Sequence, residues 1–300
     1  MTIVVAGATG LAGSAIVRAY EKAGKEVIGV NRSVCDLLDT KPSLVVDAAA
    51  KVGGIGANNA YPVEFLADNV RIQSNLMEAA HAADVEKFIF LGSSCIYPRD
   101  CAQPIKEEYL LTGPLEETNS AYAIAKIAGI ELIKSFRKEY DRKWISLMPT
   151  NLYGPRDNFE LQGSHVLPAF IRRFVEAQAE GRAKETLWGT GSPMREFLHV
   201  DDLASAVVIS GEKYDSAQHL NIGSGEDLTI KALAELVAEL AGFTGEIAWD
   251  SSKPDGTPRK VLDVTKVKSL GWAPAISLRE GIASTIEWYI DATAKGVSRR

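Results

Sequence analysis

The first thirteen residues place the strongest constraint on how this chain can fold. Residues 2–6, TIVVA, form a short apolar run, and Gly7, Gly10 and Gly13 follow it at three-residue spacing before an amphipathic stretch begins. Such glycines allow a tight turn and let backbone N–H groups approach a pyrophosphate, while the next helix N-terminus supplies a positive partial charge. An isolated match can be a plain structural turn, but a preceding strand and a following helix are the context that a dinucleotide site requires. The sequence therefore predicts a nucleotide-binding loop here.

Short apolar runs alternate with helical periodicity through the first half of the chain. The predicted strands are 2–6, 26–30, 43–49, 87–92 and 144–148, and the predicted helices are roughly 11–23, 59–82 and 120–139. Continuous apolar runs are typical of parallel strands that are buried on both faces. Their β-α-β order predicts an α/β fold with a doubly wound parallel sheet, the Rossmann arrangement. The short connection between the second and third strands leaves room for one or two helical turns.

The pattern changes after Pro149, and we expect a second part of the molecule there. Residues 151–164 have the composition of a loop, and later segments predict helices near 165–180, 229–241 and 278–294 and a strand at 246–250. We therefore expect a Rossmann domain of residues 1–154 plus about 199–221, and a smaller α/β substrate lobe of about 155–198 and 222–300.

Composition excludes several classes of function. The formal charge is −6 and no Lys/Arg run occurs, which argues against a nucleic-acid partner. We expect no signal peptide, and no membrane contact, because no apolar run approaches the roughly 18 residues of a membrane span. The three cysteines form no cluster with metal-ligand spacing, so we expect reduced thiols in a cytoplasmic protein without a metal site.

The end of the second predicted strand bears on the choice of cofactor. An acidic residue here often holds the ribose 2′-hydroxyl of NAD, whereas an arginine accommodates the 2′-phosphate of NADP. This chain has Asn31 and Arg32. The pair favours NADP(H), although Arg32 can also be an ordinary solvated surface arginine.

Tyr122 and Lys126 lie four residues apart, on one face of a predicted helix. A nearby cation lowers the pKa of a tyrosine, and a tyrosine tuned in this way can exchange a proton with a carbonyl or alcohol oxygen. The alternative is an amphipathic surface helix without chemistry. The glycine loop and the segment GSSCIYP (92–98) make the chemical interpretation the stronger one.

These motifs together resemble the extended short-chain dehydrogenase/reductases that act on nucleotide sugars. The matching segments are AAAKVGGI (48–55), LGSSCIYP (91–98), YAIAKIAGIEL (122–132), MPTNLYGPRDNF (148–159), SHVLPAFIRRF (164–174), PMREFLHVDD (193–202), SKPDGTPRKVLDV (252–264) and LGWAP (270–274). The nearest branch epimerises C3 and C5 of GDP-4-keto-6-deoxy-mannose and then reduces C4 with NADPH. One departure is a short stretch after residues 36–39, where the family has a longer helix and linker.

The resemblance implies a role for each matched residue. Ser93 would hydrogen-bond the substrate ketone, Tyr122 would donate a proton, and Lys126 would bind the nicotinamide ribose and tune Tyr122. Cys95 and His165 would be the acid/base pair of the epimerisation. The implied cofactor-binding residues are Gly7, Thr9, Gly10, Leu11, Gly13, Arg32, Ala48, Ala49, Leu91, Gly92, Lys126, Pro149, Asn151, Leu152 and His165. The implied GDP-sugar contacts are Arg173, Trp188, Arg195, Asp255 and Lys260, and a homodimer would form through helices 59–82 and 120–139.

Three other interpretations stay open at this point. The chain can be a nucleotide-sugar 4-epimerase or 4,6-dehydratase, although these enzymes place acidic residues where this chain has Ser94 and Cys95. It can also be a non-catalytic NADP-binding regulator, a class that usually lacks the tyrosine–lysine pair. Finally, Cys95 can be a packing residue, because unpaired cysteine is often buried.

Overall fold

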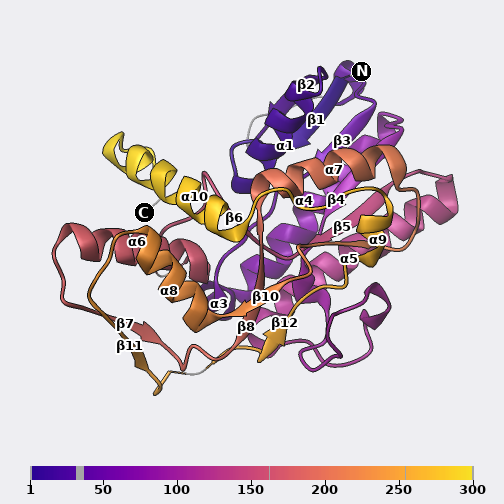
Figure 1. Ribbon diagram of the computed structural model, residues 1–300. Helices are drawn as coiled ribbons and strands as arrows, with labels where there is room; N and C mark the ends of the chain where they lie inside the picture. Colours follow the sequence, from indigo (N-terminus) through magenta and orange to yellow (C-terminus); the bar gives the residue numbers. More distant parts are fainter. Residues whose placement is uncertain (1, 32–36, 162, 254, 299–300) are drawn as a thin grey trace.

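Six parallel strands form the main sheet of the computed structural model, which describes residues 2–31, 37–161, 163–253 and 255–298 (Figure 1). In spatial order the strands are β2 (Glu26–Val30), β1 (Thr2–Ala6), β3 (Leu44–Asp47), β4 (Lys87–Leu91), β5 (Ile145–Pro149) and β9 (Leu220–Ile222). The chain adds β2 on one side of β1 and β3 on the other, so the winding direction reverses between β1 and β3. Ligands of doubly wound sheets bind at such a switch point. The predicted α/β fold class is confirmed.

Helices cover both faces of the sheet in two packed pairs. One pair is α1 (Leu11–Lys22) with α7 (Val200–Lys213), and the other is α4 (Pro62–Ala82) with α5 (Ser120–Tyr140). Two helix glycines show which face of the sheet each pair covers. A Cβ on Gly129 of α5 would collide with the Phe90 ring, so α5 packs on the face to which Phe90 points. A Cβ on Gly211 of α7 would lie 3.2 Å from Ile89 Cδ1, so α7 packs on the face to which Ile89 points. Neighbouring residues of β4 therefore point to opposite helix layers, as strand geometry requires.

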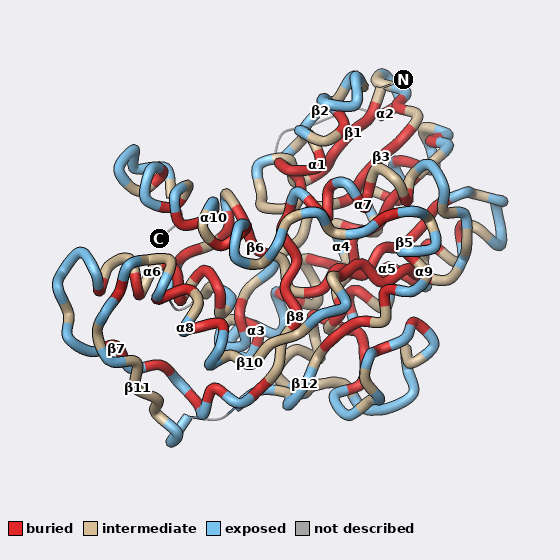
Figure 2. The backbone as a smooth tube through the Cα atoms, in the orientation of Figure 1, coloured by how far each residue is buried: buried red, intermediate tan, exposed pale blue. Residues whose placement is uncertain are grey.

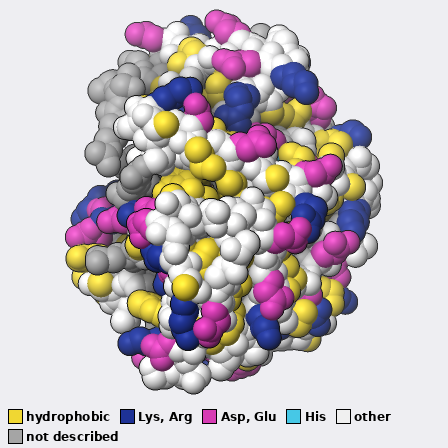
Figure 3. Space-filling model, turned by 60° about the vertical axis from the view of Figure 1, so that its left-hand side comes forward, with side chains coloured by type: hydrophobic (Ala, Val, Ile, Leu, Met, Phe, Trp, Pro, Cys, Tyr) yellow, Lys and Arg dark blue, Asp and Glu magenta, His cyan; other side chains and the backbone are white. Residues whose placement is uncertain are grey.

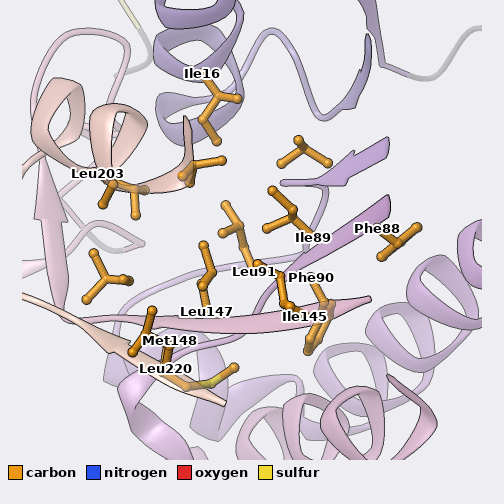
Figure 4. Close-up of a cluster of buried hydrophobic side chains, with 14 of the residues drawn as sticks. Ile16, Phe88, Ile89, Phe90, Leu91, Ile145, Leu147, Met148, Leu203 and Leu220 are labelled. Atoms are coloured by element: carbon orange, nitrogen blue, oxygen red, sulfur yellow. The ribbon is translucent and has the colours of Figure 1, made fainter. Parts of the chain in front are cut away.

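The core lies between these layers. Figure 4 shows Ile16 of α1 and Leu203 of α7 beside Ile89 and Leu147 of the central strands. The buried backbone is concentrated along the same strands in Figure 2. Burial on both faces explains why β4 and β5 read as continuous apolar runs in the sequence.

Two predicted segments differ from the structure. The predicted helix 59–82 is two helices, α3 (Ile55–Ala60) and α4, because Pro62 has no N–H for a continuing helix and instead occupies the first turn of α4. The predicted loop 151–164 begins with a strand, β6 (Asn151–Tyr153), which pairs with β8 (Met194–His199). A three-residue strand is too short to show a periodicity. Between β2 and β3 the described residues form one short helix, α2 (Leu37–Thr40).

A smaller lobe packs beside the carboxyl ends of the main strands (Figure 1). Its sheets contain β6 and β8 with β10 (Asp227–Thr229) and β12 (Arg259–Lys260), and β7 (Lys184–Trp188) with β11 (Glu246–Asp250). Its helices are α6 (Val166–Ala179), α8 (Ile230–Leu240) and α10 (Leu278–Ala294), and they enclose a second apolar cluster. The remaining short helices are α9 (Thr265–Ser269) and the 3-10 turns η1 (Ser94–Ile96), η2 (Glu107–Tyr109) and η3 (Glu117–Asn119).

The apolar clusters bear on how the chain divides into parts. Leu262, Val267 and Trp272 follow β12 in the sequence but pack in the cluster of the main sheet. The segment around α9 therefore lies with the larger part, whereas α8 and α10 lie with the smaller one. The domain bounds given above stay a prediction.

Helix length and the surface charges bear on the expectation of no membrane contact. None of the described helices is long and apolar enough to cross a bilayer. On the face that Figure 3 shows, acidic and basic side chains are interspersed.

Candidate active site

The glycine loop has the shape of a phosphate cradle. Gly7 has a φ of 77°, and a Cβ there would lie 2.6 Å from the Ala48 carbonyl oxygen. A Cβ on Gly13 would collide with the Gly7 carbonyl oxygen. Gly10 precedes the first turn of α1 without a side-chain cap, so the N–H groups of that turn are left for an anion. The residues present therefore fit a dinucleotide, because the glycines allow the tight backbone packing of the turn and the uncapped first turn of α1 can receive a pyrophosphate.

The other predicted cofactor residues lie around this cradle or at the ends of the neighbouring strands. Thr9 is exposed in the turn and Leu11 begins α1. The others follow or end the central strands: Ala48 and Ala49 after β3, Leu91 and Gly92 at β4, Pro149 at β5, and Asn151 and Leu152 in β6. Arg32 lies outside the described residues.

Ser93 and Tyr122 meet at the end of β4. Ser93 caps η1, and its hydroxyl accepts a hydrogen bond of 3.2 Å from the Cys95 N–H. The Tyr122 side chain on α5 is largely buried, and its hydroxyl interacts with the Ser93 side chain. Two hydroxyl groups from different elements thus converge on one point, which is what binding of a single ketone oxygen requires.

The electrostatics of Tyr122 differ from the expectation. Burial raises the pKa of Tyr122, a negative charge on Cys95 raises it further, and only the Ser93 hydrogen bond lowers it. The Lys126 ammonium lies 5.9 Å from the centre of the Tyr122 ring and donates to the Leu91 carbonyl oxygen at 3.0 Å. The predicted lowering of the Tyr122 pKa by Lys126 is therefore wrong for this structure, in which burial dominates the pKa of the tyrosine. At neutral pH Tyr122 carries its proton.

Cys95 is in contact with a cation from the smaller lobe. Lys260 Nζ lies 3.6 Å from Cys95 Sγ, and Lys260 is held on β12 opposite Arg195 of β8. Arg195 interacts electrostatically with Cys95 and with Asp255, while its burial lowers its pKa. An ammonium and a guanidinium therefore both face the thiol.

His165 stands at the start of α6, next to the same cation. Its side chain is open to solvent, yet the surrounding protein desolvates the imidazole enough to lower its pKa, and the Lys260 ammonium lowers it further. Lys260 is thus near both predicted acid/base residues. The two groups reach this place from separate parts of the chain, η1 and α6.

The remaining predicted substrate residues are divided between the site and the lobe surface. Trp188 on β7 is 73% exposed, with the Lys253 ammonium 5.8 Å from its ring centre. Asp255 accepts hydrogen bonds from the Thr190 N–H at 3.0 Å and from its hydroxyl at 2.7 Å. Arg173 on α6 donates to Glu185 and to the Thr186 carbonyl oxygen, each at 2.6 Å. Arg173 is therefore engaged within the lobe in this structure.

Sequence reasoning missed two buried carboxylates. Asp47 ends β3, and Glu196 of β8 accepts hydrogen bonds from Gly225 N–H at 2.7 Å and Leu262 N–H at 2.9 Å. The second of these hydrogen bonds holds Leu262, which closely follows Lys260 in the sequence, against β8. The available signals were an acidic residue at the end of the apolar strand β3 and one directly before Phe197 and Leu198 in β8.

Among the described residues, no group of three or more His, Cys, Asp and Glu side chains is arranged to hold a metal ion.

Comparison with known proteins connects this geometry to a family. The model of the NAD dependent epimerase/dehydratase family matches residues 3–223. The chain is 52% identical over 299 residues to GDP-L-fucose synthase 1 of Arabidopsis thaliana, covering 96% of this chain and 93% of the relative. It is 48% identical over 309 residues to GDP-L-fucose synthase of Escherichia coli K12, covering 96% of each. The crystal structure of a GDP-L-fucose synthetase from Naegleria fowleri bound to NADP superposes with a TM-score of 0.90 at 27% identity, covering 100% of this chain and 96% of that one.

Proposed function

The chain belongs to the NAD dependent epimerase/dehydratase family, and from that premise we propose that it epimerises C3 and C5 of GDP-4-keto-6-deoxy-mannose and reduces C4 with NADPH, giving GDP-L-fucose. The observation that carries the proposal is the meeting of three groups at the end of β4: the Ser93 and Tyr122 hydroxyls, and the Cys95 thiol beside Lys260. A ketone bound by the two hydroxyls would lie next to the thiol.

The epimerisation needs a stabilised enolate and two proton carriers. A 4-ketone acidifies the protons on C3 and C5, and hydrogen bonds from Ser93 and Tyr122 would stabilise the negative charge that develops on its oxygen. Cys95 would exchange a proton on one face of the sugar and His165 on the other. The Lys260 ammonium lies 3.6 Å from the Cys95 sulfur, on the atom that would carry the exchanged proton.

The reduction uses the same two hydroxyls. NADPH, when bound in the glycine cradle, supplies the hydride. Tyr122 gives its proton to the C4 oxygen, and the raised pKa of the tyrosine keeps that proton in place until charge develops. Lys126 would bind the nicotinamide ribose, because its ammonium lies at the end of β4 beside Leu91.

Recognition of the GDP group would use the smaller lobe. Arg195 and Lys260 both face the thiol, and their charges suit a diphosphate. The exposed indole of Trp188 offers an apolar face to the base or the sugar. Arg173 would have to exchange its contact with Glu185 for a contact with the substrate.

NADPH is the proposed cofactor for two reasons. Arg32 has the charge that a 2′-phosphate needs, and the Naegleria fowleri neighbour is bound to NADP. We also propose a homodimer through α4 and α5, because Val63 and Ile124 leave apolar surface on these helices, 76% and 49% exposed.

Product analysis tests the proposal. The protein is incubated with GDP-4-keto-6-deoxy-mannose and NADPH, and the sugar is identified by NMR, with Tyr122→Phe as a control. GDP-L-fucose is expected. A sugar reduced at C4 with unchanged configuration at C3 and C5 would instead show a 4-reductase without epimerase activity. GDP-mannose, which has a hydroxyl at C4, is offered in a second incubation, where inversion at C4 or loss of water would support a 4-epimerase or a 4,6-dehydratase. NADPH binding without turnover would support a regulator.

A further inference from the structure

Asp47, which ends β3, and Lys126 of α5, whose ammonium reaches the end of β4, are buried residues of opposite charge. Their exposed fractions are 1% and 2%. Asp47 is paired with Phe90 in the register of β3 and β4, and aligned residues of neighbouring strands point to the same face of a sheet. Lys126 Nζ lies 4.8 Å from the Phe90 ring centre on that face. The carboxylate and the ammonium are therefore on one side of the sheet, beneath the predicted nicotinamide site.

Each group lacks a full set of local partners. One Asp47 oxygen accepts a hydrogen bond of 3.0 Å from the Ala49 N–H, and the other is buried without a hydrogen-bond partner in the described part of the chain. The hydrogen bond that Lys126 makes goes to a neutral group, the Leu91 carbonyl oxygen. A buried charge is costly unless an opposite charge compensates it. The negative charge of Asp47 and the positive charge of Lys126 can therefore compensate each other.

We propose that Asp47 is a positioning residue, whose carboxylate keeps Lys126 charged and directed toward the end of β4. This inference rests on the proposed function, in which the Lys126 ammonium binds the cofactor ribose. Asp47 would touch neither cofactor nor substrate, and would act through Lys126 alone.

The charges around the pair support this assignment. Burial raises the pKa of Asp47 to about 6, and the Lys126 charge and the Ala49 N–H oppose that rise. Burial lowers the pKa of Lys126 to about 8, and the Asp47 charge opposes that fall. The other titratable groups facing this region are Tyr122, on the same helix as Lys126, and Cys95, which faces Tyr122. Both members of the pair are thus ionised between about pH 6 and pH 8.

Direct titration of Lys126 tests the proposal without any turnover. The protein is labelled with ¹³Cε-lysine, the Lys126 signal is assigned by its loss in Lys126→Arg, and its pKa is followed by NMR in wild type and in Asp47→Asn. The substitution keeps the shape and removes the charge. The Lys126 pKa should fall by about one pH unit, the typical effect of losing a close opposite charge. Asp202→Asn is the matched control, because it also changes a buried carboxylate, and it should leave the Lys126 pKa unchanged.

A second readout separates this proposal from the proposed function. In Asp47→Asn the alkaline limb of the reductase pH profile should move to lower pH together with the Lys126 titration. An unchanged Lys126 pKa in folded Asp47→Asn would overturn the inference, whatever substrate the enzyme uses. If Asp47→Asn does not fold, Asp47→Ser, which is smaller and neutral, answers the same question. Failure to make GDP-L-fucose would overturn the proposed function and leave the titration result standing.

Discussion

Lys260 Nζ lies 3.6 Å from Cys95 Sγ, although the two residues are 165 positions apart in the sequence. The contact joins the lobe strand β12 to the turn after β4. Glu196 holds this part of the lobe in place through the Leu262 N–H. The proposed epimerisation thiol therefore lies where the two parts of the molecule meet.

Replacing Cys95 by serine should stop the epimerisation. Serine is nearly the same size but is a much weaker acid, so solvent deuterium should no longer exchange into C3 and C5 of the substrate, while NADPH still binds. Exchange is measured by NMR in D₂O without turnover. Cys101→Ser is the matched control, because Cys101 is the other described cysteine and is also half-buried. Wild-type exchange in both Cys95→Ser and His165→Gln would show that these residues only pack.

Replacing Tyr122 by phenylalanine should slow the reduction and leave the fold intact. The ring stays, but the proton donor is lost, so turnover should fall by at least about 10²-fold. Tyr20→Phe is the control, since Tyr20 is also a buried tyrosine with a raised pKa and lies on α1. NADPH oxidation followed at 340 nm gives the rate. Near-normal reduction by Tyr122→Phe would remove this residue from the mechanism.

Replacing Glu196 by glutamine should destabilise the protein. Both carboxylate oxygens accept backbone N–H groups, and an amide nitrogen cannot accept either of these bonds. The free energy of unfolding should fall by about 1–3 kcal/mol, the typical effect of a buried group left unsatisfied. Urea denaturation measures it, with the exposed Glu226→Gln as control. Equal midpoints for the two variants would contradict this account of Glu196.

His219 should make the protein less stable as the pH falls. Burial, aided by Lys134 and Lys266, lowers its pKa to about 4, while an unfolded histidine titrates near about 6.5. The unfolded chain therefore binds more protons than the folded one between these values, so stability is lost as the pH falls from about 6.5 to about 4. The loss from this residue is at most about 3 kcal/mol.

Substitution of His219 isolates that contribution. His219→Gln cannot titrate, so its unfolding free energy should fall less over this pH range than that of wild type. Denaturation at several pH values measures the difference. An identical pH dependence for the two proteins would contradict the assignment.

Sequence patterns predicted elements best where one strong local signal was present. The apolar runs 2–6 and 26–30 predicted β1 and β2 with their observed bounds. β1 is buried from Ile3 to Ala6, whereas β2 lies at the edge of the sheet and keeps only its apolar composition as a signal. The predicted helix 278–294 also has its observed bounds, and Ser277 and Glu280 form a capping box at its start. Short lobe strands such as β12 were not predicted. A strand of two residues is too short to show an alternation of apolar and polar side chains, and it forms only by pairing with a neighbouring strand.

Parts of the site depend on long-range contacts that no local pattern contains. The segments around Cys95 and Lys260 both carry family motifs, yet their direct contact follows from the packing of the lobe on the sheet. Sequence analysis missed Asp47 because this residue ends an apolar strand. Its electrostatic role depends on the charge of Lys126, which lies far away in the sequence on α5. The pKa of Tyr122 was predicted in the wrong direction because burial cannot be read from a four-residue spacing.

An isotope map of the product tests the proposed two-step reaction most directly. Wild-type protein is given GDP-4-keto-6-deoxy-mannose and unlabelled NADPH in D₂O, and each position of the isolated sugar is examined by NMR. Two epimerisations followed by one reduction predict deuterium at C3 and C5, protium at C4, and the stereochemistry of GDP-L-fucose. A reduced sugar with protium at C3 and C5 and its original configuration would contradict the account.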